Sequence, residues 1–273
     1  MEGNVIFALG LTLFAGLATG VGALIAFFTT RTNKKFLSAA LGFSAGVMIY
    51  VSLIEIFVKA KDSLTTALGD TQGYWMTVIG FFGGMLLIAL IDRFIPKKSN
   101  PHEVKTVEDV NAVKLQKSVG IDEEKLMKMG VFTALAIGIH NFPEGIATFM
   151  SAIQDPNVGI AIAIAVAIHN IPEGIAVAVP IYFATGIRKK AFKLSFFSGL
   201  AEPVGAIVAY IILMPFLTEA MFGIIFAGVA GIMVFISLDE LLPAAQKYDE
   251  THLSIYGLVA GMAVMAVSLL LLA

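Results

Sequence analysis

Apolar runs long enough to cross a lipid bilayer take up most of this chain of 273 residues. Hydrophobic residues make up 58% of the sequence and charged residues only 14%, whereas a soluble domain carries about a quarter charged residues. An apolar helix of about 20 residues spans the ~30 Å hydrocarbon core of a bilayer. The sequence therefore predicts an all-α integral membrane protein that crosses the membrane several times, with the lipid bilayer as a partner and no nucleic-acid partner.

Polar breaks divide the apolar runs into eight predicted spans. The segment 95–126, between the third and fourth spans, has the densest charge and is predicted to be a solvated, mobile loop. The first residues, MEGNVIFALG, have no basic stretch before the apolar run, so they are interpreted as the first span and not as a cleaved signal peptide. The predicted spans lie at 4–28, 36–58, 74–94, 127–152, 158–184, 192–215, 219–245 and 253–272.

The basic residues predict the orientation of these spans in the cell membrane. Sixteen of the eighteen Lys and Arg residues fall in the first, third, fifth and seventh connections, and only Lys59 and Lys61 fall on the other side. Basic residues concentrate on the cytoplasmic side of membrane proteins. Both termini are therefore expected outside the cytoplasm, and the loop 95–126 inside.

Three pairs of segments repeat along the chain with nearly constant offsets. GLATGVGALIA at 16–26 resembles GLAEPVGAIVA at 199–209, and GVMIYVSLIEI at 46–56 resembles GIMVFISLDEL at 231–241. In the third pair, Gly80, Gly84 and Met85 match Gly257, Gly261 and Met262. The offsets are 183, 185 and 177, and the matching spans cross the membrane in opposite directions. The sequence thus predicts an inverted repeat of 3 + 2 + 3 helices, which is typical of secondary transporters.

The two central spans carry nearly identical motifs, HNFPEGIA at 140–147 and HNIPEGIA at 169–176. Helical spacing places the His, Asn and Glu of each motif on one face. The prolines Pro143 and Pro172 remove a backbone donor and are expected to free the carbonyls of Ile139 and Ile168. Each motif lies about 14 residues, or ~20 Å, from the turn QDPN at 154–157, which places both near mid-membrane. The candidate metal ligands are His140, Asn141, Glu144, His169, Asn170 and Glu173.

A third carboxylate, Glu202, is predicted at similar depth in the sixth span, where its repeat partner in the first span is Thr19. Ionisable residues inside a membrane are costly and mark a functional site by default. Imidazole nitrogens and carboxylate oxygens suit Zn²⁺, Fe²⁺, Mn²⁺ and Co²⁺, and three carboxylates could neutralise two divalent ions. The alternative is a structural polar network that joins the two central helices.

Three further carboxylates are predicted near the ends of spans. Glu55 and Glu240 are repeat partners in SLIE and SLDE, and Asp239 precedes Glu240. They could attract cations where these enter and leave the protein, or they could simply reach water at the membrane surface. His102 and His252 fall in polar connections and are interpreted as solvated residues rather than ligands.

With HNFPEG, HNIPEG and the pair Glu202–Pro203, the chain resembles the ZIP family of divalent metal transporters, and most closely its bacterial ZupT/GufA-like branch. The resemblance covers essentially the whole chain. It implies import of Zn²⁺, and also of Fe²⁺, Mn²⁺, Co²⁺ and Cd²⁺, into the cytoplasm. It implies a binuclear site at the seven candidate ligands, a bundle of spans 1, 4, 5 and 6 that moves against spans 2, 3, 7 and 8, and a homodimer.

Two features depart from the family pattern. The loop 95–126 contains one histidine, His102, where many relatives have several, and Glu55 occupies a position whose chemistry varies in the family. Protons are expected to compete with the metal, because neutral imidazole and ionised carboxylate are the forms that bind.

Two other functions use the same residues. An intramembrane metalloenzyme could hold a catalytic metal here, but HNxPE lacks the second His of HExxH and the duplicated motif supplies no separate general base. A metal-selective channel would share the site. We expect a transporter and not an enzyme, with the metal as the transported substrate and no resident cofactor.

Overall fold

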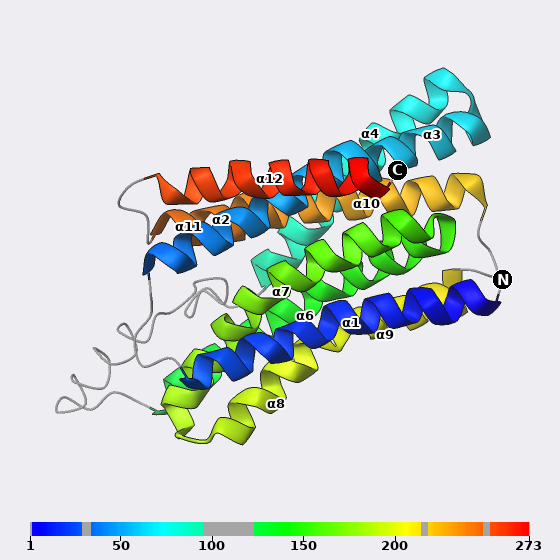
Figure 1. The fold of residues 1–273 in the computed structure, drawn as a ribbon. Coiled ribbons are helices and arrows are strands. Elements are labelled where there is room, and N and C mark those ends of the chain that lie inside the picture. The colour runs from blue at the N-terminus through cyan, green and yellow to red at the C-terminus, as the bar shows by residue number, and fades with distance from the viewer. Residues whose placement is uncertain (1, 29–33, 95–122, 214–217, 248–251, 273) are drawn as a thin grey trace.

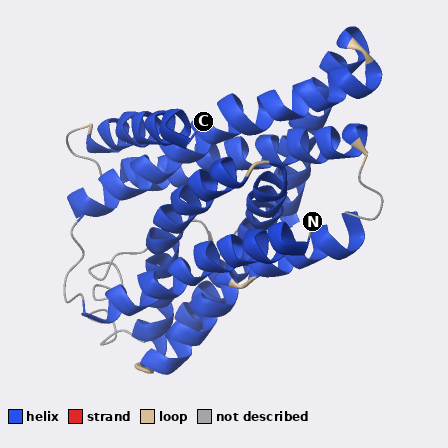
Figure 2. Ribbon diagram, turned by 45° about the vertical axis from the view of Figure 1, so that its right-hand side comes forward, coloured by secondary structure: helices blue, strands red, loops and turns tan. Residues whose placement is uncertain are grey.

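The computed structural model describes residues 2–28, 34–94, 123–213, 218–247 and 252–272, and in these ranges the regular secondary structure is entirely helical (Figures 1 and 2). Short π-helical segments, named η, interrupt three of the long helices. The elements are α1 (Glu2–Phe28), α2 (Lys34–Tyr50), η1 (Val51–Ile56), α3 (Phe57–Leu68), α4 (Asp70–Phe94), α6 (Glu123–Gln154), α7 (Pro156–Thr185), α8 (Arg188–Gly199), α9 (Ala201–Val208), η3 (Ala209–Leu213), α10 (Glu219–Ile236), η5 (Ser237–Leu241), α11 (Leu242–Lys247) and α12 (Leu253–Leu272).

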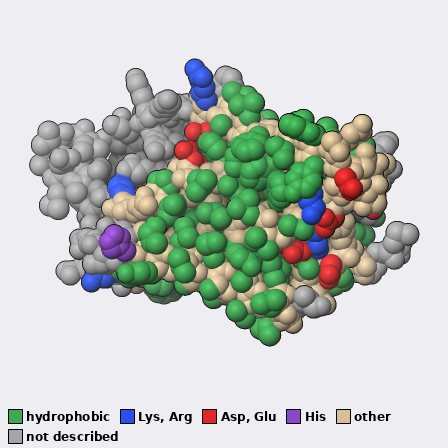
Figure 3. Space-filling model, turned by 90° about the horizontal axis from the view of Figure 1, so that it is seen from above, with side chains coloured by type: hydrophobic (Ala, Val, Ile, Leu, Met, Phe, Trp, Pro, Cys, Tyr) green, Lys and Arg blue, Asp and Glu red, His purple; other side chains and the backbone are tan. Residues whose placement is uncertain are grey.

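Seven helices in the described ranges are long and apolar enough to cross a membrane. Hydrophobic side chains cover the face seen in Figure 3, and charged side chains gather toward its two ends. The predicted all-α integral membrane protein is thereby confirmed. The predicted fourth span, 127–152, falls within α6, which is not among the seven helices. Most of the predicted loop 95–126 lies outside the described residues.

The second predicted span is longer than expected. The helix does not end near residue 58 but continues through η1 and α3 to Leu68, and Gly69, with φ of +81°, makes the turn into α4. The charged residues that suggested a loop occupy the outer faces of α3, where Lys59 pairs with Glu55 one turn earlier at 3.0 Å. The opposite face buries Ala60 and Leu64 against α10. The prediction that Glu55 lies near the end of its helix is therefore wrong, because 13 helical residues follow it.

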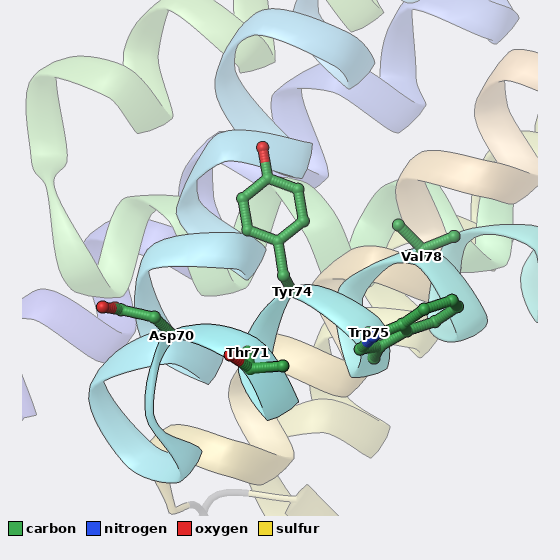
Figure 4. Close-up of a pocket in the computed structure, with 5 residues that line it drawn as sticks. All are labelled: Asp70, Thr71, Tyr74, Trp75 and Val78. Atoms are coloured by element: carbon green, nitrogen blue, oxygen red, sulfur yellow. The ribbon is translucent and has the colours of Figure 1, made fainter.

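Aromatic side chains mark the start of the next helix. Figure 4 shows Tyr74 and Trp75 projecting from the first turns of α4, beside Asp70 and Thr71, where they line a shallow pocket. Both rings are more than half exposed. Trp and Tyr are enriched at the boundary between lipid and water, so the α3–α4 hairpin extends beyond this boundary.

Glycines allow pairs of helices to approach until backbone touches backbone. A Cβ atom on Gly22 of α1 would overlap the carbonyl oxygen of Ile171 in α7, and one on Gly205 of α9 would overlap that of Phe142 in α6. Both residues of the second contact follow from the first by the sequence offsets, 183 for the glycines and 29 reversed for the two central motifs.

The same correspondence holds in the other repeated spans. A Cβ on Gly46 of α2 would overlap the carbonyl oxygen of Leu258 in α12, and one on Gly231 of α10 would overlap that of Phe81 in α4. Here the glycines are 185 apart and their neighbours 177 apart. Equivalent residues thus make equivalent contacts in both halves of the chain.

A single residue joins the two central helices. Asp155 is the N-cap of α7, and its Oδ1 accepts hydrogen bonds from the backbone N–H groups of Asn157 (2.9 Å) and Val158 (3.4 Å). Pro156 follows at the first helical position, where its missing N–H costs nothing. The predicted turn at 154–157 therefore forms an antiparallel hairpin of α6 and α7.

Replacing Asp155 by alanine should lower the stability of the purified protein by about 1 kcal/mol, because two backbone N–H groups lose their acceptor. Thermal unfolding in detergent measures the effect. Asp155→Asn serves as the control, since asparagine is an equally good N-cap. A variant with alanine as stable as the asparagine variant would contradict this role.

Candidate metal centre

Three buried ionisable side chains meet where α6 and α7 cross. Nε2 of His169 lies 3.2 Å from each carboxylate oxygen of Glu144 and 3.6 Å from Oε1 of Glu173. Their exposed fractions are 1% for His169 and Glu144 and 5% for Glu173. Glu173 comes one turn after His169 on the same helix, whereas Glu144 comes from the other motif. The hairpin thus brings the two motifs together, as their spacing predicts.

The two asparagines connect this cluster to the neighbouring helices. In the orientation that satisfies its whole amide group, Nδ2 of Asn141 donates to Oε2 of Glu173 and to the carbonyl oxygen of Ile137, both at 3.1 Å. Nδ2 of Asn170 donates to the carbonyl oxygen of Ala15 at 2.9 Å and to Oε1 of Glu202. Glu202 is completely buried. The third carboxylate therefore lies beside the α7 motif, as its predicted depth suggested.

One serine links three helices around the cluster. The Ser195 hydroxyl of α8 donates to the carbonyl oxygens of Gly174 in α7 (3.1 Å) and Thr19 in α1 (3.4 Å). Its role was not predicted, because nothing in the pattern of apolar residues distinguishes this serine from others. The signal that could have found it is its repeat partner Thr12, which lies 183 residues earlier.

The remaining predicted site residues are placed less completely or lie elsewhere. His140 is part of α6, but its side chain is outside the part of the chain that the structure describes. Glu55 is in η1 and pairs with Lys59, while Asp239 is exposed and Glu240 half-buried in η5. His252 is exposed, and His102 is outside the described residues.

Among the described side chains, no group of three or more His, Asp or Glu residues has the geometry of a bound metal ion. The pairwise distances around His169 nevertheless match those between metal ligands. Two ligand atoms about 2.0–2.1 Å from a tetrahedral zinc ion lie about 3.4 Å apart. The contacts of 3.2 Å and 3.6 Å lie on either side of this value.

Comparison with known proteins identifies the family. The sequence profile described as ZIP Zinc transporter matches residues 3–269. The chain is 83% identical over 272 residues to the zinc transporter ZupT of Lysinibacillus sphaericus (strain C3-41), with 100% of both chains covered. It is 73% identical to ZupT of Oceanobacillus iheyensis and 60% identical to ZupT of Streptococcus mutans serotype c, and 99% of each chain is covered in both cases. The chain therefore belongs to the ZIP family of zinc transporters and not to a family of enzymes.

Proposed function

We propose that this protein imports divalent transition metals, zinc first among them, across the cell membrane into the cytoplasm. The observation that carries the proposal is the buried contact of His169 with Glu144 and Glu173 at the crossing of α6 and α7. Nitrogen and oxygen ligands in this combination suit Zn²⁺ and also Fe²⁺, Mn²⁺, Co²⁺ and Cd²⁺. The relatives named zinc transporters support zinc as the main substrate.

In this proposal the metal site is binuclear and comprises His140, Asn141, Glu144, His169, Asn170, Glu173 and Glu202. The contacts that link Asn141 to Glu173 and Asn170 to Glu202 support the assignment, because they connect the candidate ligands into one buried group. The three carboxylates neutralise most of the charge of two divalent ions.

The proposed architecture is eight membrane spans in an inverted repeat of 3 + 2 + 3 helices. Its support is that contacts recur at equivalent residues, such as Gly22 with Ile171 and Gly205 with Phe142. The asparagines agree with this, since Asn170 donates to the carbonyl of Ala15, and Asn141 in its other amide orientation reaches the carbonyl of the equivalent Ser198 at 3.4 Å.

Two groups of helices exchange access to the site in this mechanism. One group consists of α1, α6, α7, α8 and α9 and the other of α2, α3, α4, α10 and α12. Among the described glycines, every backbone-close contact joins helices of the same group. Between the groups, α7 packs against α2 and α12, and α6 packs against α10. Side chains therefore make the contact between groups, so one group can slide against the other as a rigid unit.

The proposed orientation places both termini outside the cytoplasm. In Figure 1, α1 begins and α12 ends toward the same end of the bundle, and α8 lies at the other end. α8 begins with Arg188, Lys189 and Lys190, which favour the cytoplasmic side. We also propose a homodimer, as the family resemblance implies, and roles for Glu55, Asp239 and Glu240 in attracting cations to and from the site.

Uptake into vesicles tests this function. Purified protein is reconstituted into lipid vesicles that contain a zinc-sensitive dye, and initial rates are measured against external Zn²⁺, with Fe²⁺, Mn²⁺, Co²⁺, Cd²⁺ and Mg²⁺ as competitors. We expect saturable uptake that the transition metals and Cd²⁺ inhibit and Mg²⁺ does not. Flux that rises linearly with zinc concentration would favour a channel, and rates equal to those of protein-free vesicles would refute the proposal.

Replacing Glu202 by glutamine should reduce the number of bound zinc ions by one. The amide keeps the size of the side chain but removes the negative charge beside Asn170. Titration calorimetry with the purified protein measures the stoichiometry, and Glu219→Gln, a change at the exposed first residue of α10, is the control. An unchanged stoichiometry would exclude Glu202 as a ligand of the second ion.

A further inference from the structure

Two hydroxyl groups on α6 continue the face that carries Glu144 toward the turn at Asp155. Thr148 follows Glu144 by four residues and Ser151 follows Thr148 by three, a spacing that keeps all three on one helix face. Both hydroxyl-bearing residues are 0% exposed. Neither hydroxyl oxygen has a hydrogen-bond partner within the part of the chain that the structure describes. We call Thr148 and Ser151 the hydroxyl pair.

Other buried hydroxyls in this protein behave differently. Thr12, Thr77 and Ser237 each donate to the carbonyl oxygen four residues earlier, at 2.8 Å. This bond is the ordinary way to satisfy a hydroxyl inside a helix that water does not reach. A buried hydroxyl without a partner is unfavourable, so the hydroxyl pair is not explained by the stability of the fold.

The hairpin places the hydroxyl pair between the metal centre and the end of the bundle. At the centre, Glu144 contacts His169, and near the turn Gly159 packs against Ala152. Thr148 and Ser151 come between these two levels on α6. The α7 residues at the corresponding levels, Ile162 and Ala165, are buried and apolar. Two hydroxyl oxygens thus lie along an otherwise apolar part of the hairpin.

We infer that the hydroxyl pair forms a step on the outer path of the metal, where hydroxyl oxygens replace water around a partly hydrated divalent cation on its way to Glu144. The inference rests on the proposed function and orientation. Hydroxyl oxygens are neutral, so they can hold a divalent cation briefly without binding it as tightly as the carboxylates do. Their spacing of three and four residues gives the cation successive contacts about 4.5–6 Å apart along the helix.

Cysteine accessibility tests whether this path opens to the outside. Since the chain has no cysteine, single replacements Thr148→Cys and Ser151→Cys introduce the only thiol. In reconstituted vesicles of known orientation, we expect both thiols to react with a small, charged, membrane-impermeant methanethiosulfonate added outside, and Cd²⁺ to slow the reaction. Met150→Cys is the control, because Met150 is equally buried but lies on another face of the same helix. Reaction only from the inside, or equal reaction at all three positions, would overturn the inference.

Removing the hydroxyls tests their contribution to transport. The double variant Thr148→Val with Ser151→Ala should lower kcat/KM for zinc uptake about tenfold, the lower range for polar groups that assist metal ligands. Zinc affinity at equilibrium and the thermal stability should not fall, because only groups without partners are removed. Thr77→Val, which removes a hydroxyl bonded to its own helix in α4, should leave uptake unchanged.

The outcomes separate this inference from the proposed function. If wild-type vesicles take up zinc, a Glu144 variant does not, and the double variant transports normally, the hydroxyl pair has no role and the function stands. Loss of uptake together with loss of stability or of zinc affinity in the double variant would also overturn the inference, because it would show a structural role. Absence of uptake by the wild type would instead refute the proposed function.

Discussion

Replacing Glu144 by alanine is expected to reduce zinc uptake at least about 100-fold, the upper range for the loss of a single group around a metal. Its carboxylate is the partner of His169 at 3.2 Å and belongs to the other motif. The substitution therefore removes a charge and also separates the two halves of the site. Initial rates in reconstituted vesicles measure the effect, with protein content and folding checked by size-exclusion chromatography.

The controls for this variant use the same vesicles. Glu144→Asp retains the charge on a shorter side chain and should recover part of the activity. His252→Asn removes an exposed imidazole and should transport normally, because asparagine tolerates the positive φ of 61° at this position. Adding His169→Ala to Glu144→Ala should cause little further loss, since groups that act together are not additive. Uptake by Glu144→Ala within threefold of wild type would show that the assignment of the metal centre is wrong.

The second large effect is expected from Gly22→Val. A Cβ at this position would overlap the carbonyl oxygen of Ile171 and lie 3.1 Å from the Cα of Gly174. Backbone atoms cannot move aside as a flexible side chain does, so α1 and α7 must separate. We expect a loss of about 3 kcal/mol or more, the top of the range for overpacking, which corresponds to about 6–12 °C in Tm for a chain of this size.

Matched glycines elsewhere in the helices show whether the contact is responsible. Gly205→Val should cause a similar loss, because a Cβ there would overlap the carbonyl oxygen of Phe142. At Gly10 and Gly83, no described atom lies within 4 Å of an added Cβ. Gly10→Ala and Gly83→Ala should leave Tm unchanged or raise it slightly, as alanine favours a helix. Equal losses at contacting and open glycines would refute the packing argument.

The pattern of residues was sufficient to predict the helical membrane fold and the meeting of the two motifs. Both follow from local rules: apolar length sets the spans, and the short turn at Asp155 requires α6 and α7 to be antiparallel neighbours. Matching depth from the turn then brings Glu144 opposite His169.

Other features depend on neighbours that are distant in sequence. The extension of the second span to Leu68 was missed because Lys59 and Lys61 resemble a loop, whereas α10 covers the apolar face formed by Ala60 and Leu64. The π-helical turns at Glu55 and Glu240 have no recognised sequence signal. The asparagine contacts with carbonyl oxygens require α1 and α8 to be in place, and the order of the chain alone does not position them.

The long helix from Lys34 to Leu68 has a consequence for which group of helices moves. Its 35 residues are about 52 Å long at 1.5 Å per residue, well beyond the ~30 Å hydrocarbon core. The end beyond the core carries Lys59, Lys61 and Asp62, and α4 starts beside it with Tyr74 and Trp75. Drawing these charges into lipid would cost a few kcal/mol each. The hairpin therefore works as a float that fixes the depth of its own group, so that the vertical displacement needed for transport falls to the helices that carry the metal.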